Sequence, residues 1–255
     1  MSIPRFYCPP TLFPGTIFNA PDQIAGSVEL PATAAHHASR VLRLRVNDEV
    51  YIFDGAGNEL HGRICAIAGK SVRLDRLHSY AINRESPLHI VLAQALCSSE
   101  KMDWIVQKAT ELGVSAIQPL QTERSITRLS DERAEKRAEH WRRVTIAACE
   151  QCSRNTLPIV YPPQDFTRWL VAMRPSTATK LMLAPTSRNS LSKQVKPAHS
   201  IALLIGPEGG WSAAEMEMSK QANFIPISFG ARILRTETAA IAGITALQTL
   251  WGDLG

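Results

Sequence analysis

From about residue 88 to the end, short apolar runs alternate with stretches whose apolar residues recur at helical spacing. A continuous apolar run is typical of a strand covered on both faces, whereas apolar residues three and four apart mark one face of a helix. The predicted strands are Leu88–Leu96, Ala116–Leu120, Pro158–Tyr161, Lys180–Leu183, Ile201–Ile205 and Phe224–Phe229. The predicted helices are Glu100–Leu112, Ser130–Cys152, Ser212–Ala222 and Ala239–Trp251. This alternation predicts one α/β domain with a mostly parallel sheet.

The first eighty or so residues follow a different pattern, in which short strands are separated by turn residues, and they predict a small β-barrel. Its predicted strands are Ile3–Tyr7, Ile17–Phe18, Ser27–Leu30, Glu49–Phe53, Glu59–Ile67 and Ser71–Leu77. A short helix is predicted at Ala32–Leu42. The polar segment that ends at Pro87 is the predicted linker. The chain therefore divides into an N-terminal domain of residues 1–78, a linker of residues 79–87 and a C-terminal domain of residues 88–255.

Two polar loops follow neighbouring predicted strands near the end of the chain. The strand Ile201–Ile205 ends at Gly206-Pro207-Glu208-Gly209-Gly210, and Ser212 with Glu215 forms a capping box that starts the next helix. The strand Phe224–Phe229 is broken by Gly230, which leads into a polar loop that ends at Glu237. In open parallel sheets ligands bind beyond the carboxyl ends of the strands, where both loops are expected to lie.

The loop glycines do not match a known phosphate-binding pattern. Neither the dinucleotide fingerprint G-x-G-x-x-G nor the P-loop motif is present, and Pro207 removes one backbone donor from any phosphate cradle. A Gly-Gly pair alone is usually a structural turn that uses the conformational freedom of glycine. A second polar loop, which carries two arginines and a glutamate, favours a binding site over two unrelated turns.

Composition is that of a globular protein. The chain has 255 residues, of which 45% are hydrophobic, and this is enough for a sizeable core. The 28 basic and 23 acidic residues give a net charge of +5, which permits a polyanionic partner without requiring one. Five scattered cysteines and no apparent signal peptide favour a reducing cytoplasm. The longest apolar runs are too short to span a membrane.

No metal site is predicted. Cys149 and Cys152 have the spacing of positions on one face of the predicted helix, and a single C-x-x-C without a second pair is a weak signal for metal. The pair His36-His37 lacks a third ligand nearby. Charge alone favours a solvated helix face for the basic residues around this pair.

Five sequence strings, in order along the chain, resemble the SPOUT superfamily of methyltransferases. They are HHASRVLRLRVNDEVYIFDG from His36, MDWIVQKATELGVSAIQPLQTERS from Met102, EQCSRNTLPIV from Glu150, IGPEGGWS from Ile205 and RILRTETA from Arg232. Within that superfamily the chain is similar to the ribosomal RNA uridine-N3 methyltransferases that act on the small subunit. The resemblance covers nearly the whole chain.

The resemblance implies a C-terminal SPOUT domain with a deep trefoil knot, an N-terminal PUA-like domain that binds RNA, and an obligate homodimer. It implies S-adenosylmethionine as the cofactor, held mainly by the backbone of three loops, because glycines let the main chain approach a ligand closely. The cofactor-binding residues that it implies are Leu183, Ala184, Pro185, Ile205, Gly206, Gly209, Gly210, Ser228, Phe229, Gly230, Ile233, Leu234 and Thr238.

The implied reaction is methylation of N3 of a uridine in 16S ribosomal RNA, within the assembled small subunit. Deprotonated N3 shares its negative charge with two carbonyl oxygens, and a guanidinium can stabilise that charge with two parallel donors. Arg235 is favoured over Arg232 for this role. Glu208 or Glu237 could accept the proton, or could instead hold an arginine in place.

The candidate RNA contacts are Arg5, His36, Arg40, Arg43, Arg124 and Arg154. Basic side chains of this kind bind phosphates and position RNA without reading its sequence. Glu123, Gln151 and Ser153 are further positions that match the family motifs, and their roles stay open. Two alternatives to the implied reaction remain: methylation of another RNA, and a ribosome-assembly factor that binds RNA without catalysis.

Overall fold

The computed structural model describes residues 3–12, 26–80, 82–197 and 200–255. The chain forms two compact units. The first comprises Met1–Glu85 together with Cys149–Leu157, and the second comprises Ser86–Ala148 together with Pro158–Gly255. The strand predicted at Ile17–Phe18 lies outside the described residues.

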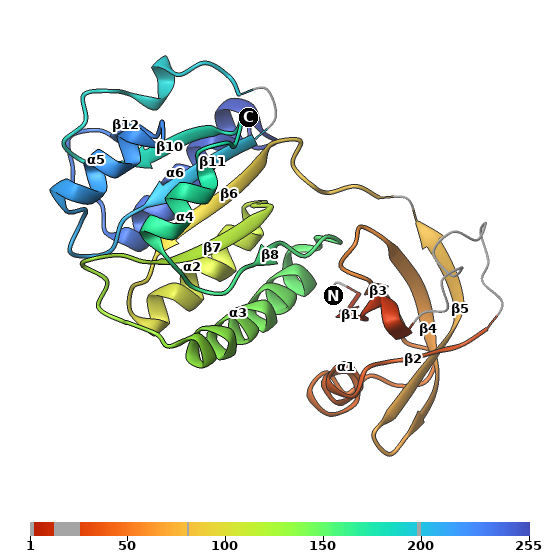
Figure 1. The fold of residues 1–255 in the computed structure, drawn as a ribbon. Coiled ribbons are helices and arrows are strands. Elements are labelled where there is room, and N and C mark those ends of the chain that lie inside the picture. Colours follow the sequence, from red (N-terminus) through yellow and green to blue (C-terminus); the bar gives the residue numbers. More distant parts are fainter. Residues whose placement is uncertain (1–2, 13–25, 81, 198–199) are drawn as a thin grey trace. The chain divides into compact units, whose positions relative to one another are not determined.

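The first unit contains a five-stranded sheet with the strand order β1-β3-β4-β5-β2 (Figure 1). Its strands are β1 (Arg5–Tyr7), β2 (Val28–Glu29), β3 (Glu49–Phe53), β4 (Glu59–Ala68) and β5 (Ser71–Tyr80). Strands β1 and β3 are parallel, and the other pairs are antiparallel. The strands predicted as a barrel thus form a sheet whose edge strands, β1 and β2, are not paired with each other in the described ranges. The predicted helix is present as α1 (Ala32–His36), which continues as a π-helical turn over His37–Val41.

A buried polar network joins residues 149–157 to this sheet. The Arg5 guanidinium pairs with the carboxylate of Glu59, whose side chain is fully buried. Nη2 of Arg5 also donates to Oδ1 of Asn155 at 2.7 Å. On the other side, Arg84 Nη1 lies 3.2 Å from Glu59 Oε2. The backbone N–H of Tyr7 donates to the Glu150 carboxylate at 2.9 Å. The last residues of helix α3 (Asp131–Cys152) and the segment that follows them are therefore an integral part of the first unit.

Two of the candidate RNA contacts, Arg5 and Arg154, belong to this network. The side chains of Arg5 and Arg154 are only 6% and 5% exposed. Arg154 Nη2 lies 2.5 Å from the carboxylate of Glu85, in the same unit. Both guanidinium groups are thus buried and paired with a carboxylate inside the first unit, and contact of either with RNA stays a prediction.

The second unit is built around seven parallel strands, six of them in the order β12-β10-β11-β6-β7-β8, with β9 beside β7 (Figure 1). The strands are β6 (His89–Ala95), β7 (Ala116–Gln121), β8 (Ile159–Val160), β9 (Gln164–Asp165), β10 (Thr179–Leu183), β11 (Ser200–Ile205) and β12 (Ile225–Ile227). The helices are α2 (Ser99–Glu111), α3 (Asp131–Cys152), α4 (Phe166–Met173), α5 (Ala213–Gln221) and α6 (Thr236–Trp251). The predicted mostly parallel α/β domain is confirmed.

Both faces of this sheet are covered, as the continuous apolar runs predict. Along β11, Leu203 packs into a core with α2, α3 and α6, whereas its neighbours Ala202 and Leu204 pack into a second core with α4 and α5. Gly243 of α6 faces Leu203 so closely that an added Cβ would lie 2.9 Å from a methyl carbon of that leucine. No helix in the described ranges is both long enough and apolar enough to cross a membrane.

The capping box at the start of α5 is present. The Ser212 hydroxyl accepts from the Glu215 N–H at 3.2 Å, and the Glu215 carboxylate accepts from the Ser212 N–H at 2.9 Å. The same carboxylate, which is almost completely buried, also accepts from the Glu123 N–H at 2.8 Å. Glu215 therefore fixes both the start of α5 and the segment that follows β7.

We expect Glu215→Ala to lower the free energy of unfolding by about 1–2 kcal/mol, because two backbone N–H groups lose their acceptor. Denaturant unfolding monitored by circular dichroism measures this change. Glu217→Ala, on the exposed side of the same helix, is the matched control and should change stability by less than about 0.5 kcal/mol. Equal effects of the two substitutions would contradict the assigned role.

Candidate active site

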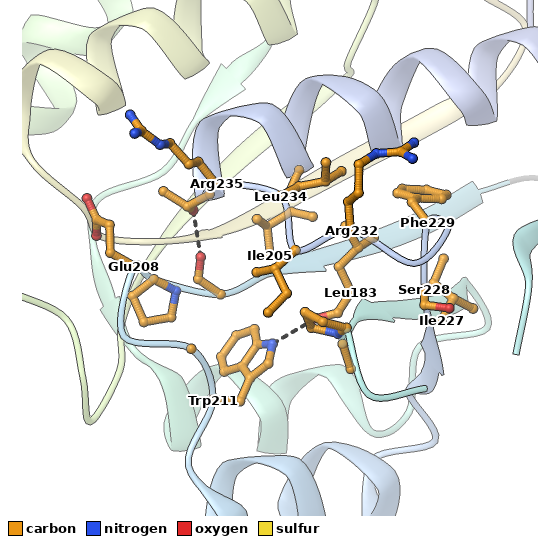
Figure 2. A pocket seen from close by; sticks show the side chains of 18 of the residues that line it. Leu183, Ile205, Glu208, Trp211, Ile227, Ser228, Phe229, Arg232, Leu234 and Arg235 are labelled. Atoms are coloured by element: carbon orange, nitrogen blue, oxygen red, sulfur yellow. Dashed lines mark hydrogen bonds between the residues drawn. The ribbon is translucent and has the colours of Figure 1, made fainter. Parts of the chain in front are cut away.

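A cavity of about 410 Å³ lies beyond the carboxyl ends of β10, β11 and β12 (Figure 2). It is bounded by the three loops that follow these strands and by Lys101 of α2. The lining residues are Lys101, Leu183, Ala184, Pro185, Ile205, Gly206, Pro207, Glu208, Gly210, Trp211, Ile227, Ser228, Phe229, Gly230, Arg232, Ile233, Leu234, Arg235, Thr236 and Ala239. Glu208 and Arg235, which come from different loops, thus share one cavity, as the two-loop prediction requires.

Trp211 connects two of the loops. Its indole Nε1 donates to the carbonyl oxygen of Leu183 at 3.0 Å, which ties the β11–α5 loop to the end of β10 (Figure 2). A Cβ added at Gly206 would lie 3.0 Å from a carbon of the indole ring. Glycine at position 206 therefore lets the ring pack against the main chain at the end of β11.

A buried hydrogen-bond chain connects the start of α6 with the end of β11 and with the neighbouring strand β6. The Thr236 hydroxyl, in the first turn of α6, donates to the carbonyl oxygen of Gly206 at 2.6 Å. It accepts from Gln94 Nε2 at 3.0 Å, and Gln94 is fully buried on the central strand β6. The start of α6 and the end of β11 are thereby held to the centre of the sheet.

We expect Thr236→Val to weaken cofactor binding by up to about tenfold and to lower the free energy of unfolding by about 1–3 kcal/mol. Valine has nearly the shape of threonine, but it leaves the Gly206 carbonyl and one Gln94 N–H without their partner. Calorimetric titration with S-adenosylmethionine measures the change in affinity, and denaturant unfolding measures the change in the free energy of unfolding. Thr245→Val, at an exposed position of the same helix, should change neither quantity.

The charged side chains of the cavity fall into two groups. Arg235 and Glu208 lie on one side, and Arg232 lies beside Phe229 on the other (Figure 2). Both arginines are exposed, and neither forms an ion pair with a carboxylate in the described part of the chain. Their guanidinium groups are therefore available to an anionic ligand.

Lys101 is a site residue that sequence reasoning missed. Its Nζ lies 3.2 Å from Glu208 Oε1 and 3.4 Å from Glu237 Oε2. Hydrogen bonding to Glu208 is the main cause that raises the pKa of the Lys101 ammonium, with a smaller contribution from Glu237. Beneath the cluster, burial and the Glu208 charge raise the pKa of the Cys97 thiol to about 12, so this thiol is neutral at physiological pH.

Three of the predicted site residues do not line the cavity. Gly209 lies beside it, and its carbonyl oxygen accepts from Arg124 Nη1 at 3.0 Å, which packs the Arg124 side chain against this glycine. Thr238 is exposed on α6 outside the cavity. Glu237 reaches the site only through its ion pair with Lys101. The other predicted cofactor-binding residues all belong to the lining.

The remaining RNA candidates lie on exposed surface. His36, Arg40 and Arg43 are exposed around α1 and its π-helical extension, and Arg124 is exposed beside the β11–α5 loop. Their contact with RNA remains a prediction. Within the described ranges, no three His, Cys, Asp or Glu residues gather as a possible metal site.

The arrangement suits group transfer that depends on positioning. Apolar side chains and glycine backbone form the walls, so a ligand is gripped largely by main chain and packing. The Glu208 carboxylate and two arginines line the cavity, where they are placed to accept a proton and to stabilise a developing negative charge. The site therefore has the parts needed to hold a ligand largely by main chain and to activate an acidic N–H group.

Comparisons with known proteins agree with this geometry. A family model described as an RNA methyltransferase domain matches residues 84–248, and one described as an RNA methyltransferase PUA domain matches residues 30–75. Ribosomal RNA small subunit methyltransferase E of Buchnera aphidicola (subsp. Schizaphis graminum) is 36% identical, over 91% of this chain and 94% of that protein. The protein of the same name from Bacillus subtilis is 28% identical, over 88% of this chain and 90% of that protein.

Solved structures resemble the whole chain. The crystal structure of a ribosomal RNA small subunit methyltransferase E from Neisseria gonorrhoeae, bound to S-adenosylmethionine, is 38% identical with a TM-score of 0.89. A Legionella pneumophila protein, solved in complex with the same cofactor, is 35% identical, also with a TM-score of 0.89. Each comparison covers all of both chains.

Proposed function

Because this chain belongs to the ribosomal RNA small subunit methyltransferase E family, we propose that it transfers the methyl group of S-adenosylmethionine to N3 of a uridine in 16S ribosomal RNA. The single observation that carries the proposal is the cavity beyond β10, β11 and β12. It unites the three loops with the carboxylate of Glu208 and the guanidinium of Arg235.

The cavity fits the cofactor through its backbone and its apolar walls. Gly206, Gly210 and Gly230 allow close approach of main chain to a ligand, while Leu183 and Leu234 supply apolar surface. The Leu183 carbonyl is already used by Trp211, and the Gly206 carbonyl by Thr236, so these contacts shape the walls before a ligand binds. When bound, S-adenosylmethionine supplies a methyl group that is already activated by its sulfonium charge.

Residues of the chain then remove the proton of the acceptor base and stabilise the negative charge that forms on it. The N3 proton of uracil passes to Glu208 or Glu237, directly or through water, and the N3 electron pair forms the new bond to the methyl carbon as the bond from that carbon to sulfur breaks. Arg235 stabilises the negative charge that deprotonation leaves on the two carbonyl oxygens. Its guanidinium is suited to this role because no carboxylate in the described ranges competes for it.

Further parts of the proposal concern the assembly. The PUA-like unit, with exposed His36, Arg40 and Arg43, binds RNA in the assembled small ribosomal subunit, in the cytoplasm. The active form is a homodimer, which is supported by the exposed Trp104 on α2 and Leu250 on α6. These two helices pack on each other, so the exposed Trp104 and Leu250 side chains belong to neighbouring elements.

We also propose that the C-terminal segment forms a deep trefoil knot. The strand order supports it, because β12 lies at the sheet edge beyond β10, whereas α6 returns to pack on α2, β6 and β11. In this proposal, the chain crosses the connection between β10 and β11 on its way back from the edge. Passage through that connection, instead of around it, produces the knot.

The test is incubation of the purified protein and isotope-labelled S-adenosylmethionine with small subunits that lack the modification, followed by nucleoside mass spectrometry. Label is expected on N3 of a uridine in 16S ribosomal RNA. Label on a ribose, on another base or in another RNA would overturn the substrate assignment. A protein that binds RNA but not the cofactor in calorimetry would overturn the reaction.

A further inference from the structure

Lys101 occupies a position that is unfavourable for a cation in an isolated helix. It is the third residue of α2, in the first turn, where the helix dipole favours negative charge and disfavours positive charge by about 0.3–1 kcal/mol. A lysine side chain usually keeps its charged end in water. Lys101 instead lies against the cavity with an only 30% exposed side chain.

Two carboxylates from different segments explain this position. Glu208 belongs to the β11–α5 loop and Glu237 to the first turn of α6, and both lie within 3.4 Å of the Lys101 Nζ. Their side chains are 25% and 18% exposed, so the three groups are partly shielded from water. Without the ammonium, two negative charges would stand close together at the cavity.

The other charged and titratable groups around the cluster do not replace Lys101. Cys97, at the end of β6, is neutral because of its raised pKa. Arg235 and Arg232 line the same cavity but form no ion pair with Glu208 or Glu237 in the described ranges. Lys101 is therefore the cation that holds the two candidate proton acceptors in place.

We infer that Lys101 is a positioning residue for methyl transfer, which acts by holding Glu208 and Glu237 together at the cavity. By bridging the two carboxylates, it fixes the β11–α5 loop relative to the start of α6. It thereby keeps one of the two carboxylates in place to accept the N3 proton of the base. This inference rests on the proposed function and adds a residue to it.

The test compares Lys101→Met with Lys108→Met in the full-length protein. Lys108 lies on the same helix and pairs at 2.8 Å with Glu111, one helical turn away and outside the cavity, so it is a matched control. For Lys101→Met we expect kcat to fall about tenfold at neutral pH, with a change of less than about twofold in the KM for S-adenosylmethionine. Lys108→Met should match the wild type in both parameters.

The pH dependence distinguishes positioning from a merely structural role. In Lys101→Met the two carboxylates repel each other, and one keeps its proton to higher pH. The acid limb of the kcat profile should therefore move up by about one pH unit, a tenfold change in proton affinity. Lys101→Arg should restore most of the rate, and adding Glu237→Gln to Lys101→Met should return the acid limb toward its original position.

A folded Lys101→Met variant with the wild-type kcat and pH profile would overturn the inference. If that variant fails to fold, Lys101→Gln, which keeps a hydrogen-bond donor without the charge, carries the same comparison. The wild type is measured in parallel, so absence of methylation by the wild type would count against the proposed function and not against Lys101. If the wild type methylates another RNA, the same variants are compared on that RNA.

Discussion

Replacing Arg235 with alanine is expected to lower kcat about 100- to 1000-fold, while the affinity for S-adenosylmethionine changes by less than about threefold. The guanidinium stands at the cavity on the same side as Glu208, and no carboxylate in the described residues neutralises it (Figure 2). The attraction between the Arg235 guanidinium and the carbonyl oxygens of uracil therefore becomes strong only as N3 loses its proton. Removing an interaction that forms only in the transition state lowers kcat and kcat/KM by the same factor.

Single-turnover methylation of under-modified small subunits measures the rate, and calorimetry measures cofactor affinity. Arg133→Ala, an exposed position in the first turns of α3, is the control for loss of one surface charge. Arg232→Ala should have a smaller effect on the rate, because Arg232 lies beside Phe229 at the opposite side of the cavity (Figure 2). An unchanged rate in Arg235→Ala would remove the proposed charge-stabilising role.

Replacing Glu59 with alanine is expected to lower the free energy of unfolding of the first unit by about 3–5 kcal/mol. Glu59 is fully buried between Arg5 and Arg84, and the Arg5 side chain is almost completely buried as well. Removing the carboxylate leaves the Arg5 charge without its counterion in a poorly solvated place. The loss is larger than for the capping and hydroxyl substitutions because a full charge is left uncompensated.

The control for this prediction lies in the same sheet. Glu49 pairs with Arg63 at 2.6 Å, but both side chains are more than a third exposed, and a surface pair of this kind contributes about 0.2–1 kcal/mol. Because the two units need not unfold together, amide hydrogen exchange in β3 and β4 is the suitable measurement, with β11 as an internal reference. Similar protection in Glu59→Ala and Glu49→Ala would contradict the assigned importance of the buried network.

The elements and the location of the site could be predicted because the signals for them are local. The apolar run Ile201–Ile205 identified a covered strand, and the pair Ser212 and Glu215 identified a helix start within a few residues. The strands and helices that were predicted for the second unit appear where the pattern indicated, with ends shifted by a few residues, whereas β9 and α4 were not predicted. The rule that ligands bind at the carboxyl ends of parallel strands then placed Glu208 and Arg235 in one cavity.

What the sequence could not provide is the pairing of side chains that are far apart along the chain. Lys101 lies within the predicted helix Glu100–Leu112, and the sequence around it does not indicate its partners. Both partners, Glu208 and Glu237, lie more than 100 residues further along the chain. Arg5 was interpreted as a phosphate contact for the same reason, since its partner Glu59 comes from another strand. Gln94, inside an apolar run, likewise gave no sign of its bond to Thr236.

The membership of residues 149–157 in the first unit has a consequence for biosynthesis. A ribosome delivers residues 1–85 first, but Asn155, which receives a hydrogen bond from Arg5, emerges only after β6, β7 and all of α3 have been made. The first unit therefore cannot mature as an independent nascent module ahead of the second. The two units are completed in an interleaved order, and a gene fragment cut at residue 85 would encode an unfinished first unit.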